Sequence, residues 1–172
     1  MQRPDLLEFA AFSIGNQTMI GLLQRVSHAS VMVDGEVTGE IGRGLMVLVA
    51  VQRNDAPQQA RRLAERLLSY RVFEDDTGRM NLDVTQVDGG LLLVPQFTLA
   101  ADTGKGNRPS FSRAAEPAAG QGLFEECVAA ARARWDKVAT GRFGANMDVE
   151  LLNQGPVTFW LEVPPAQRRG KT

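Results

Sequence analysis

Apolar and polar residues alternate along much of the chain after residue 19, and this period of two is typical of β-strands. The alternation predicts a strand over residues 20–26 and a hairpin formed by residues 30–33 and 36–41. The dipeptide Asp34-Gly35 separates the two hairpin strands, and such a pair between alternating runs is a strong signal for a tight turn. The first part of the chain is therefore expected to form antiparallel sheet.

Two continuous apolar runs, residues 45–51 and 90–94, predict strands that are buried on both faces. The second run is expected to continue past Pro95 through residues 96–99. Other extended segments are expected at residues 70–73, 138–143, 146–153 and 157–163, the last two joined by a turn at 154–156.

Two helices interrupt the strands. The first is expected to start within residues 54–58 and to run to about residue 69, with Asp55 as the N-cap and Gln58 at the position of a capping box. Residues 116–135 form the second expected helix, and Cys127 falls on its apolar stripe. We therefore expect Cys127 to be a small core residue and not a nucleophile.

Short links between strands require antiparallel neighbours, so we expect an α+β protein. Its sheet should be strand-rich, mostly antiparallel and curved or barrel-like, with two main helices on one side. No internal repeat or linker divides the chain, which predicts one domain over residues 19–163. Residues 1–18 are expected to be an N-terminal extension, disordered or arising from a non-native start, because Met19 opens a natural first strand. Residues 164–172 form a basic tail.

Composition removes several classes of function. The 172 residues carry a net charge of -1, so any RNA contact must come from a local patch. No apolar run approaches the length of a membrane span. One cysteine, Cys127, and one histidine, His28, cannot build a usual zinc site or a disulfide framework, so no metal is expected. Catalysis would have to rest on hydroxyls, carboxylates, backbone groups or the substrate itself.

Two stretches place unusual residues next to strands. In VPQFTL, Gln96 and Thr98 straddle Phe97 at the end of a hydrophobic strand, ahead of the polar loop ADTGKGNRPSFS. Polar groups at such an end must find partners or line a pocket, so a site and a plain surface loop are equally open. The second stretch, NQGPVTFWL, contains Gly155-Pro156, which taken alone predicts an ordinary turn before a strand.

These stretches occur together, in this order, in one known family. From Met19 to about Val163 the chain closely resembles the D-aminoacyl-tRNA deacylases, in the segments LLQRVSHASVMVDGEVTGEIGRGLMVLVAV, GRMNLDV, PQFTLAADTGKGNRPSF and TGRFGANMDVELLNQGPVTFWLEV. The resemblance implies a cytoplasmic homodimer, without a cofactor, that hydrolyses the ester bond between a D-amino acid and the 3′-terminal adenosine of a tRNA. It also implies action on glycyl-tRNA and rejection of L-amino acids.

The resemblance assigns roles to individual residues as well. It implies that Gln96, Phe97 and Thr98 form a catalytic wall, and that Gly155-Pro156 is a cis peptide that reaches into the partner subunit's pocket. Carbonyls of that pair can accept hydrogen bonds from the substrate ammonium, so that an L side chain would collide with the backbone. Thr98 is expected to position the substrate while the 2′-hydroxyl of the terminal adenosine helps to activate water. A nucleophilic Thr98 is the rival hypothesis, and it would want an adjacent base.

Two residues depart from the family pattern. Pro95 stands where the family usually has serine, and Gln154 stands where it commonly has aspartate, so roles of that hydroxyl and that carboxylate do not carry over. Two alternative functions stay open. One is a nucleic-acid-binding module of the same fold without hydrolysis, and the other is a relative with a trans Gly-Pro bond that edits L-amino acids.

Overall fold

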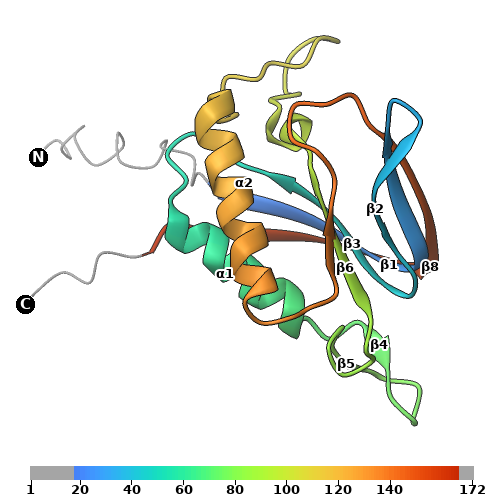
Figure 1. Ribbon diagram of the computed structural model, residues 1–172. Helices are drawn as coiled ribbons and strands as arrows, with labels where there is room; N and C mark the ends of the chain where they lie inside the picture. The colour runs from blue at the N-terminus through green and yellow to red at the C-terminus, as the bar shows by residue number, and fades with distance from the viewer. Residues whose placement is uncertain (1–17, 167–172) are drawn as a thin grey trace, which may run out of the picture.

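Strands dominate the computed structural model, which describes residues 18–166 (Figure 1). Two helices, α1 (Pro57–Ser69) and α2 (Pro117–Arg132), accompany them, and the expected α+β class with two main helices is confirmed. Most of the expected extension and of the basic tail, residues 1–17 and 167–172, lies outside the described residues. The strands are β1 (Met19–Val33), β2 (Glu36–Ile41), β3 (Gly44–Ala50), β4 (Phe73–Glu74), β5 (Met80–Leu82), β6 (Gly90–Pro95), β7 (Val138–Thr140) and β8 (Asp148–Val163).

The main sheet is built around β1. Its strand order is β2-β1-β3-β6-β7, and β8 also pairs with β1. β1 is antiparallel to β2, β3 and β8, whereas the β3–β6 and β6–β7 pairs are parallel. Because the first half of β1 pairs with β3 and its second half with β2, the sheet bends along β1 into a nearly closed, barrel-like form (Figure 1). β4 and β5 form a separate small hairpin.

The central strands are buried on both faces, as their continuous apolar runs predict. In β3, Leu45 and Val47 face the core under the helices, whereas Met46 faces a second cluster inside the bend of the sheet. In β6, Leu91 faces the first cluster and Leu92 the second. Successive side chains of a strand point to opposite faces, so two apolar cores require an unbroken apolar strand between them.

Helices α1 and α2 lie side by side over one face of the sheet (Figure 1). Their apolar stripes pack into the first core, where Leu63, Leu67 and Cys127 are fully buried. Cys127 is therefore the core residue that the helical pattern predicts. None of the helices in the described part of the chain is long and apolar enough to cross a membrane.

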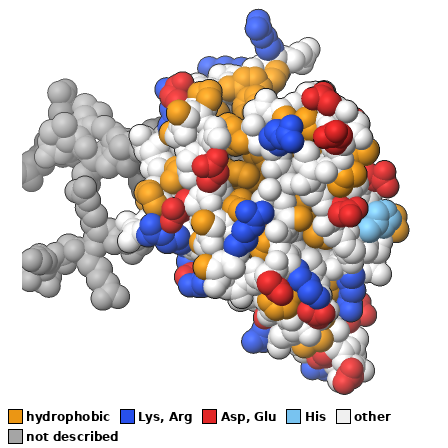
Figure 2. Space-filling model, in the orientation of Figure 1, with side chains coloured by type: hydrophobic (Ala, Val, Ile, Leu, Met, Phe, Trp, Pro, Cys, Tyr) orange, Lys and Arg blue, Asp and Glu red, His pale blue; other side chains and the backbone are white. Residues whose placement is uncertain are grey.

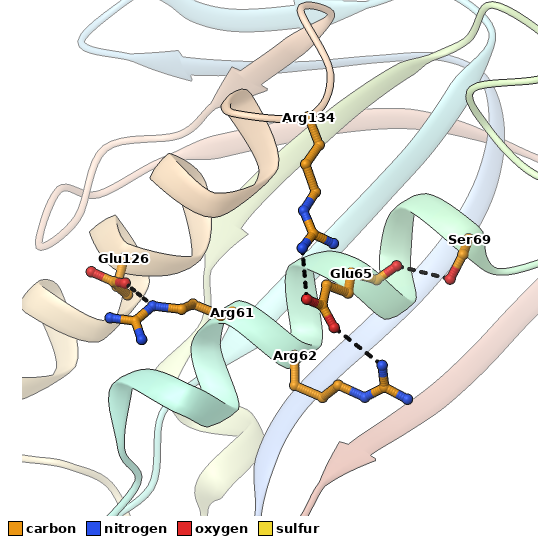
Figure 3. A network of polar contacts seen from close by, with 6 residues as sticks. All are labelled: Arg61, Arg62, Glu65, Ser69, Glu126 and Arg134. Atoms are coloured by element: carbon orange, nitrogen blue, oxygen red, sulfur yellow. Dashed lines mark hydrogen bonds and ion pairs between the residues drawn. The ribbon is translucent and has the colours of Figure 1, made fainter.

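Ion pairs connect the exposed sides of the two helices (Figure 3). Arg61 Nε lies 2.6 Å from Glu126 Oε1. The Glu65 carboxylate accepts hydrogen bonds from Arg62 Nη1 at 3.1 Å and from Arg134 Nη2 at 2.7 Å. These two donors lower the pKa of the Glu65 carboxyl group. Exposed pairs contribute little to stability, so the apolar stripes, and not these contacts, hold the helices on the sheet.

The predicted hairpin turn is confirmed. Asp34 and Gly35 have φ values of 53° and 81°, and they join Val33 to its cross-strand partner Glu36. Positive φ at both central residues is the conformation that lets a two-residue turn follow the twist of the flanking strands.

Several of the strand predictions are wrong in extent. Residues 20–26 and 30–33 belong to one strand, β1, and β7 ends at Thr140 and not at residue 143. β6 ends at Pro95, and the expected continuation forms the 3-10 turn η2 (Phe97–Ala100) instead. The last ladder bond runs from Gln96 N to Val49 O at 2.7 Å, after which the backbone turns away from the sheet. The two strands expected before and after residues 154–156 are one strand, β8, because its pairing with β1 resumes on both sides of that segment.

The start of α1 also differs from the prediction. The N-cap is Ala56 and not Asp55, and the glutamine that completes the capping box is Gln59 and not Gln58. Gln59 Oε1 accepts a hydrogen bond from Ala56 N at 2.9 Å. Gln59 Nε2 donates to Asp55 Oδ1 at 2.8 Å and to the carbonyl of Val163, the last residue of β8, at 2.9 Å. Burial raises the pKa of the neighbouring Asp55 to about 6. Gln59, at 2% exposure, thus joins the first turn of α1 to the end of the last strand.

Replacing Gln59 with alanine should leave the Ala56 N–H and the Val163 carbonyl without their side-chain partner. Because unsatisfied buried polar groups cost about 1–3 kcal/mol each, the free energy of unfolding in urea should fall by about 2–3 kcal/mol. Gln58→Ala, at the adjacent exposed position, is the matched control and should change it by less than about 0.5 kcal/mol. Equal losses in the two variants would contradict the buried role of Gln59.

Candidate active site

The end of β6 brings Gln96, Phe97 and Thr98 together. Gln96 Nε2 donates to Thr98 Oγ1 at 2.5 Å, so the two polar side chains that the sequence placed around Phe97 contact each other. The η2 turn fixes this geometry, because Ala101 N donates to Thr98 O at 3.1 Å. Phe97 is 55% exposed, an unusual state for an aromatic side chain that directly follows a core strand.

A cavity of about 540 Å³ opens beside this turn. Gln96 and Phe97 line it, and the Phe97 ring packs against the Phe111 ring with their centroids 5.1 Å apart. Arg53 and Glu116 stand at its rim as an ion pair of 3.1 Å. Its size and mixed apolar and polar lining are those of a small-ligand site. Further lining residues come from the loop before β8: Phe143, Gly144, Ala145, Asn146 and Met147.

That loop is the part of the cavity that the residue patterns alone miss. Its sequence, GRFGANM, lies between β7 and β8, although residues 141–143 and 146–147 were expected to belong to extended segments. The Phe and the Met in this glycine-containing loop are a signal that the loop packs against another part of the protein, because apolar side chains in a loop need a surface to cover. Nothing local indicates that this surface is the end of β6.

Gly155 and Pro156 lie in a bulge of β8. The pairs Gln24↔Thr158 and Val26↔Asn153 enclose one residue of β1, Arg25, but four residues of β8, numbers 154–157. The 154–157 bulge therefore stands out from the ladder. Its Gly155–Pro156 peptide bond is cis, as the resemblance implied.

The bulge is held from within by Arg25, which the sequence analysis did not single out. This side chain is 8% exposed; its Nε donates to Gln154 O at 3.3 Å and its Nη1 to Val72 O at 2.6 Å. Asn153 closes the base, because its Oδ1 accepts from Val157 N at 3.1 Å. The available signal was a lone arginine among the apolar residues of the first strand.

Glycine is required at position 155. Its φ is +124°, and a Cβ there would lie 2.8 Å from Val157 Cγ2 and 3.0 Å from Arg25 Nη2. Both Gly155 and Pro156 are exposed, so the backbone of the bulge faces outward with no side chain over it at position 155.

The two motifs do not meet within one chain. Pro95 pairs with Val49 of β3, and Val49 pairs with Gly21 of β1. The bulge instead lies opposite Arg25 of β1. Along the sheet the two motifs are offset by four residues and three strands, and the β8 residue that lines the cavity, Val149, lies near the start of that strand. No residue of the bulge lines the cavity. The structure thus brings residues 96–98 together but leaves Gly155 and Pro156 elsewhere.

Other chemical groups lie away from the cavity. His28 is exposed on β1, 3.8 Å from Glu150 and 3.3 Å from the Ser27 hydroxyl. Burial raises the pKa of the Cys127 thiol to about 12, which makes it a poor nucleophile. Residues 18–166 contain no group of three or more His, Cys, Asp or Glu side chains arranged to hold a metal ion. Within this same range, Thr98 has no carboxylate or imidazole hydrogen-bonded to it that could act as a base.

Replacing Arg25 with lysine should loosen the bulge. A lysine ammonium cannot reproduce the guanidinium fork that reaches two separate carbonyls, so one of them loses its donor. We expect the free energy of unfolding to fall by about 1–3 kcal/mol and the Val157 amide to exchange with deuterium faster. The control is Gln24→Ala, whose 3.5 Å contact with Thr158 is weak, and it should leave both quantities near wild type. Unchanged exchange at Val157 in the lysine variant would show that Arg25 does not hold the bulge.

Comparison with known proteins places this geometry in a family. The family model described as D-Tyr-tRNA(Tyr) deacylase matches residues 22–162. A D-aminoacyl-tRNA deacylase of Nitrosococcus oceani is 59% identical over 154 residues, covering 90% of this chain and 99% of the relative. One of Thioalkalivibrio sulfidiphilus is 62% identical over 147 residues, covering 86% and 99%.

Two solved structures are similar in fold. A c-Myc DNA unwinding element binding protein superposes with a TM-score of 0.80 at 36% identity, covering 84% of this chain and 99% of that one. A probable eukaryotic D-amino acid tRNA deacylase superposes with a TM-score of 0.74 at 19% identity, covering 85% and 100%, which supports the fold alone. With a family model that matches most of its length and relatives of about 60% identity, this chain belongs to the D-Tyr-tRNA(Tyr) deacylase family.

Proposed function

We propose that this protein is a hydrolase that cleaves the ester bond between a D-amino acid and the terminal ribose of a tRNA, releasing the free D-amino acid and the tRNA. Relatives that carry the name D-aminoacyl-tRNA deacylase match it over almost their whole length. The observation that carries the proposal is that Gln96 and Phe97 line a cavity of the size that a small ligand needs. The substrate would place the enzyme in the cytoplasm, where tRNAs are charged.

The site would be completed by a second copy of the chain. The motif at residues 96–98 and the 154–157 bulge lie apart in one chain, so a pocket that uses both needs the bulge of a partner subunit. β8 supports such an assembly, because it is a 16-residue strand that pairs along one edge with β1. Its exposed apolar side chains are Val149, Leu152, Phe159 and Trp160. A long apolar edge strand is a template for association.

Chiral selection is assigned to the backbone at Gly155 and Pro156. Backbone carbonyls can accept hydrogen bonds from the substrate ammonium. With the ammonium and the ester both fixed, the Cβ of an L-amino acid would meet the backbone, whereas that of a D-amino acid would point away. Glycine has no Cβ, so glycyl-tRNA is also a substrate in this proposal. The outward-facing, uncovered backbone of the bulge supports this role.

The proposed chemistry uses positioning and hydrogen-bond donors. Water attacks the ester carbonyl, the bond to the ribose oxygen breaks, and that oxygen takes up a proton. The first N–H groups of a helical turn lack partners within it, so Phe97 N and Thr98 N at the start of η2 are suited to an oxyanion. The ribose 2′-hydroxyl would help to activate the water. Gln96, which lines the cavity, would be oriented toward the substrate by its hydrogen bond to Thr98.

A second candidate function is nucleic-acid binding without hydrolysis. It rests on the similarity to the c-Myc DNA unwinding element binding protein. The two functions are separated by incubating the protein with D-Tyr-tRNA and with L-Tyr-tRNA and measuring the release of the amino acid. We expect release from the D form and none above the spontaneous rate from the L form. Absence of release from both would refute the hydrolase.

The variant Thr98→Ala tests whether Thr98 acts as a nucleophile. A positioning hydroxyl contributes about 0.5–1.5 kcal/mol, so deacylation should slow by no more than about tenfold. Loss of a nucleophile would instead cost about 10⁴-fold or more. Mass spectrometry of the wild-type protein mixed with substrate should detect no adduct, and an acyl group on Thr98 would disprove the positioning role.

The variant Trp160→Glu tests the second copy. A charge within the proposed apolar interface should raise the dimer dissociation constant by at least about 30-fold in sedimentation experiments, because large aromatic residues dominate interface energetics. Deacylation should fall together with the dimer population. The matched control is Val37→Glu, which replaces an exposed apolar residue of β2 and should alter neither. A monomeric Trp160 variant with full activity would exclude a site shared between subunits.

A further inference from the structure

The loop over residues 101–113, here called the 101–113 loop, stands at the edge of the cavity and is fixed at its base. Asp102 and Ser110 exchange two backbone hydrogen bonds of 2.7 and 3.0 Å. Arg113 Nη2 lies 3.7 Å from Asp102 Oδ2, and Arg113 O accepts a hydrogen bond from Arg53 N at 2.9 Å. The loop tip therefore projects from a closed base that belongs to the cavity rim.

The tip of the loop carries positive charge without a counter-charge. Residues 103–109, TGKGNRP, include Lys105 and Arg108 and no acidic residue. Asp102, the acidic residue at the base, already accepts from Gly104 N at 2.9 Å and pairs with Arg113. Within residues 18–166, neither Lys105 nor Arg108 forms an ion pair. Several basic residues on and beside the helices are arranged differently: Arg61, Arg62, Arg134 and Lys137 pair with carboxylates, and Arg66 donates to the carbonyl of Glu162.

The same loop reaches the cavity through Phe111. Its ring packs against Phe97 and lines the cavity, so the charged tip and the cavity mouth are parts of one structure. Figure 1 shows the loop projecting above η2, and Figure 2 shows blue side chains at the same upper edge of the molecule, next to an apolar area. A nucleic acid whose terminal nucleoside occupies the cavity has to leave past this edge.

We infer that the tip of the 101–113 loop binds the phosphates of the RNA strand that precede the terminal nucleotide. The inference rests on the proposed function, because it needs an aminoacylated RNA end in the cavity. Lys105 and Arg108 are three residues apart and so at most about 10 Å apart along the backbone, which suits two neighbouring phosphates. Unpaired cations at the end of a projecting loop lose little on meeting phosphate, since they give up no protein partner.

The test uses the double variant Lys105→Gln/Arg108→Gln with two substrates. One is D-Tyr-tRNA, and the other is D-tyrosyl-adenosine, which has the same ester but no phosphate. On the tRNA, kcat/KM should fall roughly tenfold at low salt, with a weaker dependence on salt concentration. Each phosphate contact on a single strand adds about 0.7 to the slope of log affinity against log salt concentration, so two contacts add about 1.4. Between 50 and 200 mM salt, the activity of wild type should therefore fall by about sevenfold more than that of the variant. On D-tyrosyl-adenosine the variant should match wild type.

A matched control removes the same charge elsewhere. Arg62→Gln/Lys137→Gln also exchanges one arginine, on α1, and one lysine, just before β7, both exposed. It should keep the wild-type salt slope on D-Tyr-tRNA. A loop variant with unchanged tRNA kinetics, or one that loses the same factor on both substrates, would overturn the inference. A control variant with an equally weak salt dependence would overturn it as well, because the loss of positive net charge, and not the position of the charges, would then explain the result.

Direct binding separates this inference from the proposed function. The probe is an unacylated RNA hairpin ending in CCA, labelled for fluorescence anisotropy. Wild type and the control variant should bind this RNA equally tightly, and the loop variant should bind it more weakly. If wild type hydrolyses neither ester, the proposed function fails, and loop-dependent binding of this RNA would still support the contact. Binding of this RNA that is equally tight in wild type and the loop variant would overturn it.

Discussion

The double pairing of β1 is the constraint on which the rest of the structure depends. This strand carries β3 or β2 on one edge and β8 on the other along almost its whole length. A strand hydrogen-bonded on both edges cannot shift without breaking two ladders, so it fixes the bend of the sheet and the two cores on either face of β3 and β6. It also carries Arg25, whose nearly buried guanidinium needs acceptors and finds them in the chain beyond α1 and in the 154–157 bulge.

Local patterns predicted the elements whose causes are local. The hairpin at Asp34 and Gly35, the apolar strands β3 and β6, and the buried Cys127 follow from turn chemistry and periodicity, and all are confirmed. The errors arise where distant contacts decide. Gln59 displaced Gln58 because its amide reaches Val163, 104 residues along the chain. The strands expected at residues 146–153 and 157–163 are one strand from Asp148 onward, because β1 continues past the bulge, which neither segment encodes by itself.

The candidate site shows the same division. Gln96 and Thr98 were identifiable from the residues, because polar groups at the end of a core strand need partners, and they became partners of each other. Phe143 and Met147 were not identifiable as cavity residues, since their role depends on a loop folding back over β6. Gly155 and Pro156 were singled out by resemblance, whereas their support by Arg25, on the opposite strand, was visible only in three dimensions.

The pairing of β1 with β8 has a consequence for biosynthesis. Met19 pairs with Val163, so the edge of β1 that binds β8 stays unpaired until β8 has been synthesised. Until β8 has left the ribosome, β1 presents an unpaired edge and the α1 cap lacks the Val163 carbonyl. Such non-local closure makes folding slow and exposes apolar strands while it is incomplete. The nascent chain is therefore a better client for chaperones than its size suggests, and the domain should form as one cooperative unit after synthesis.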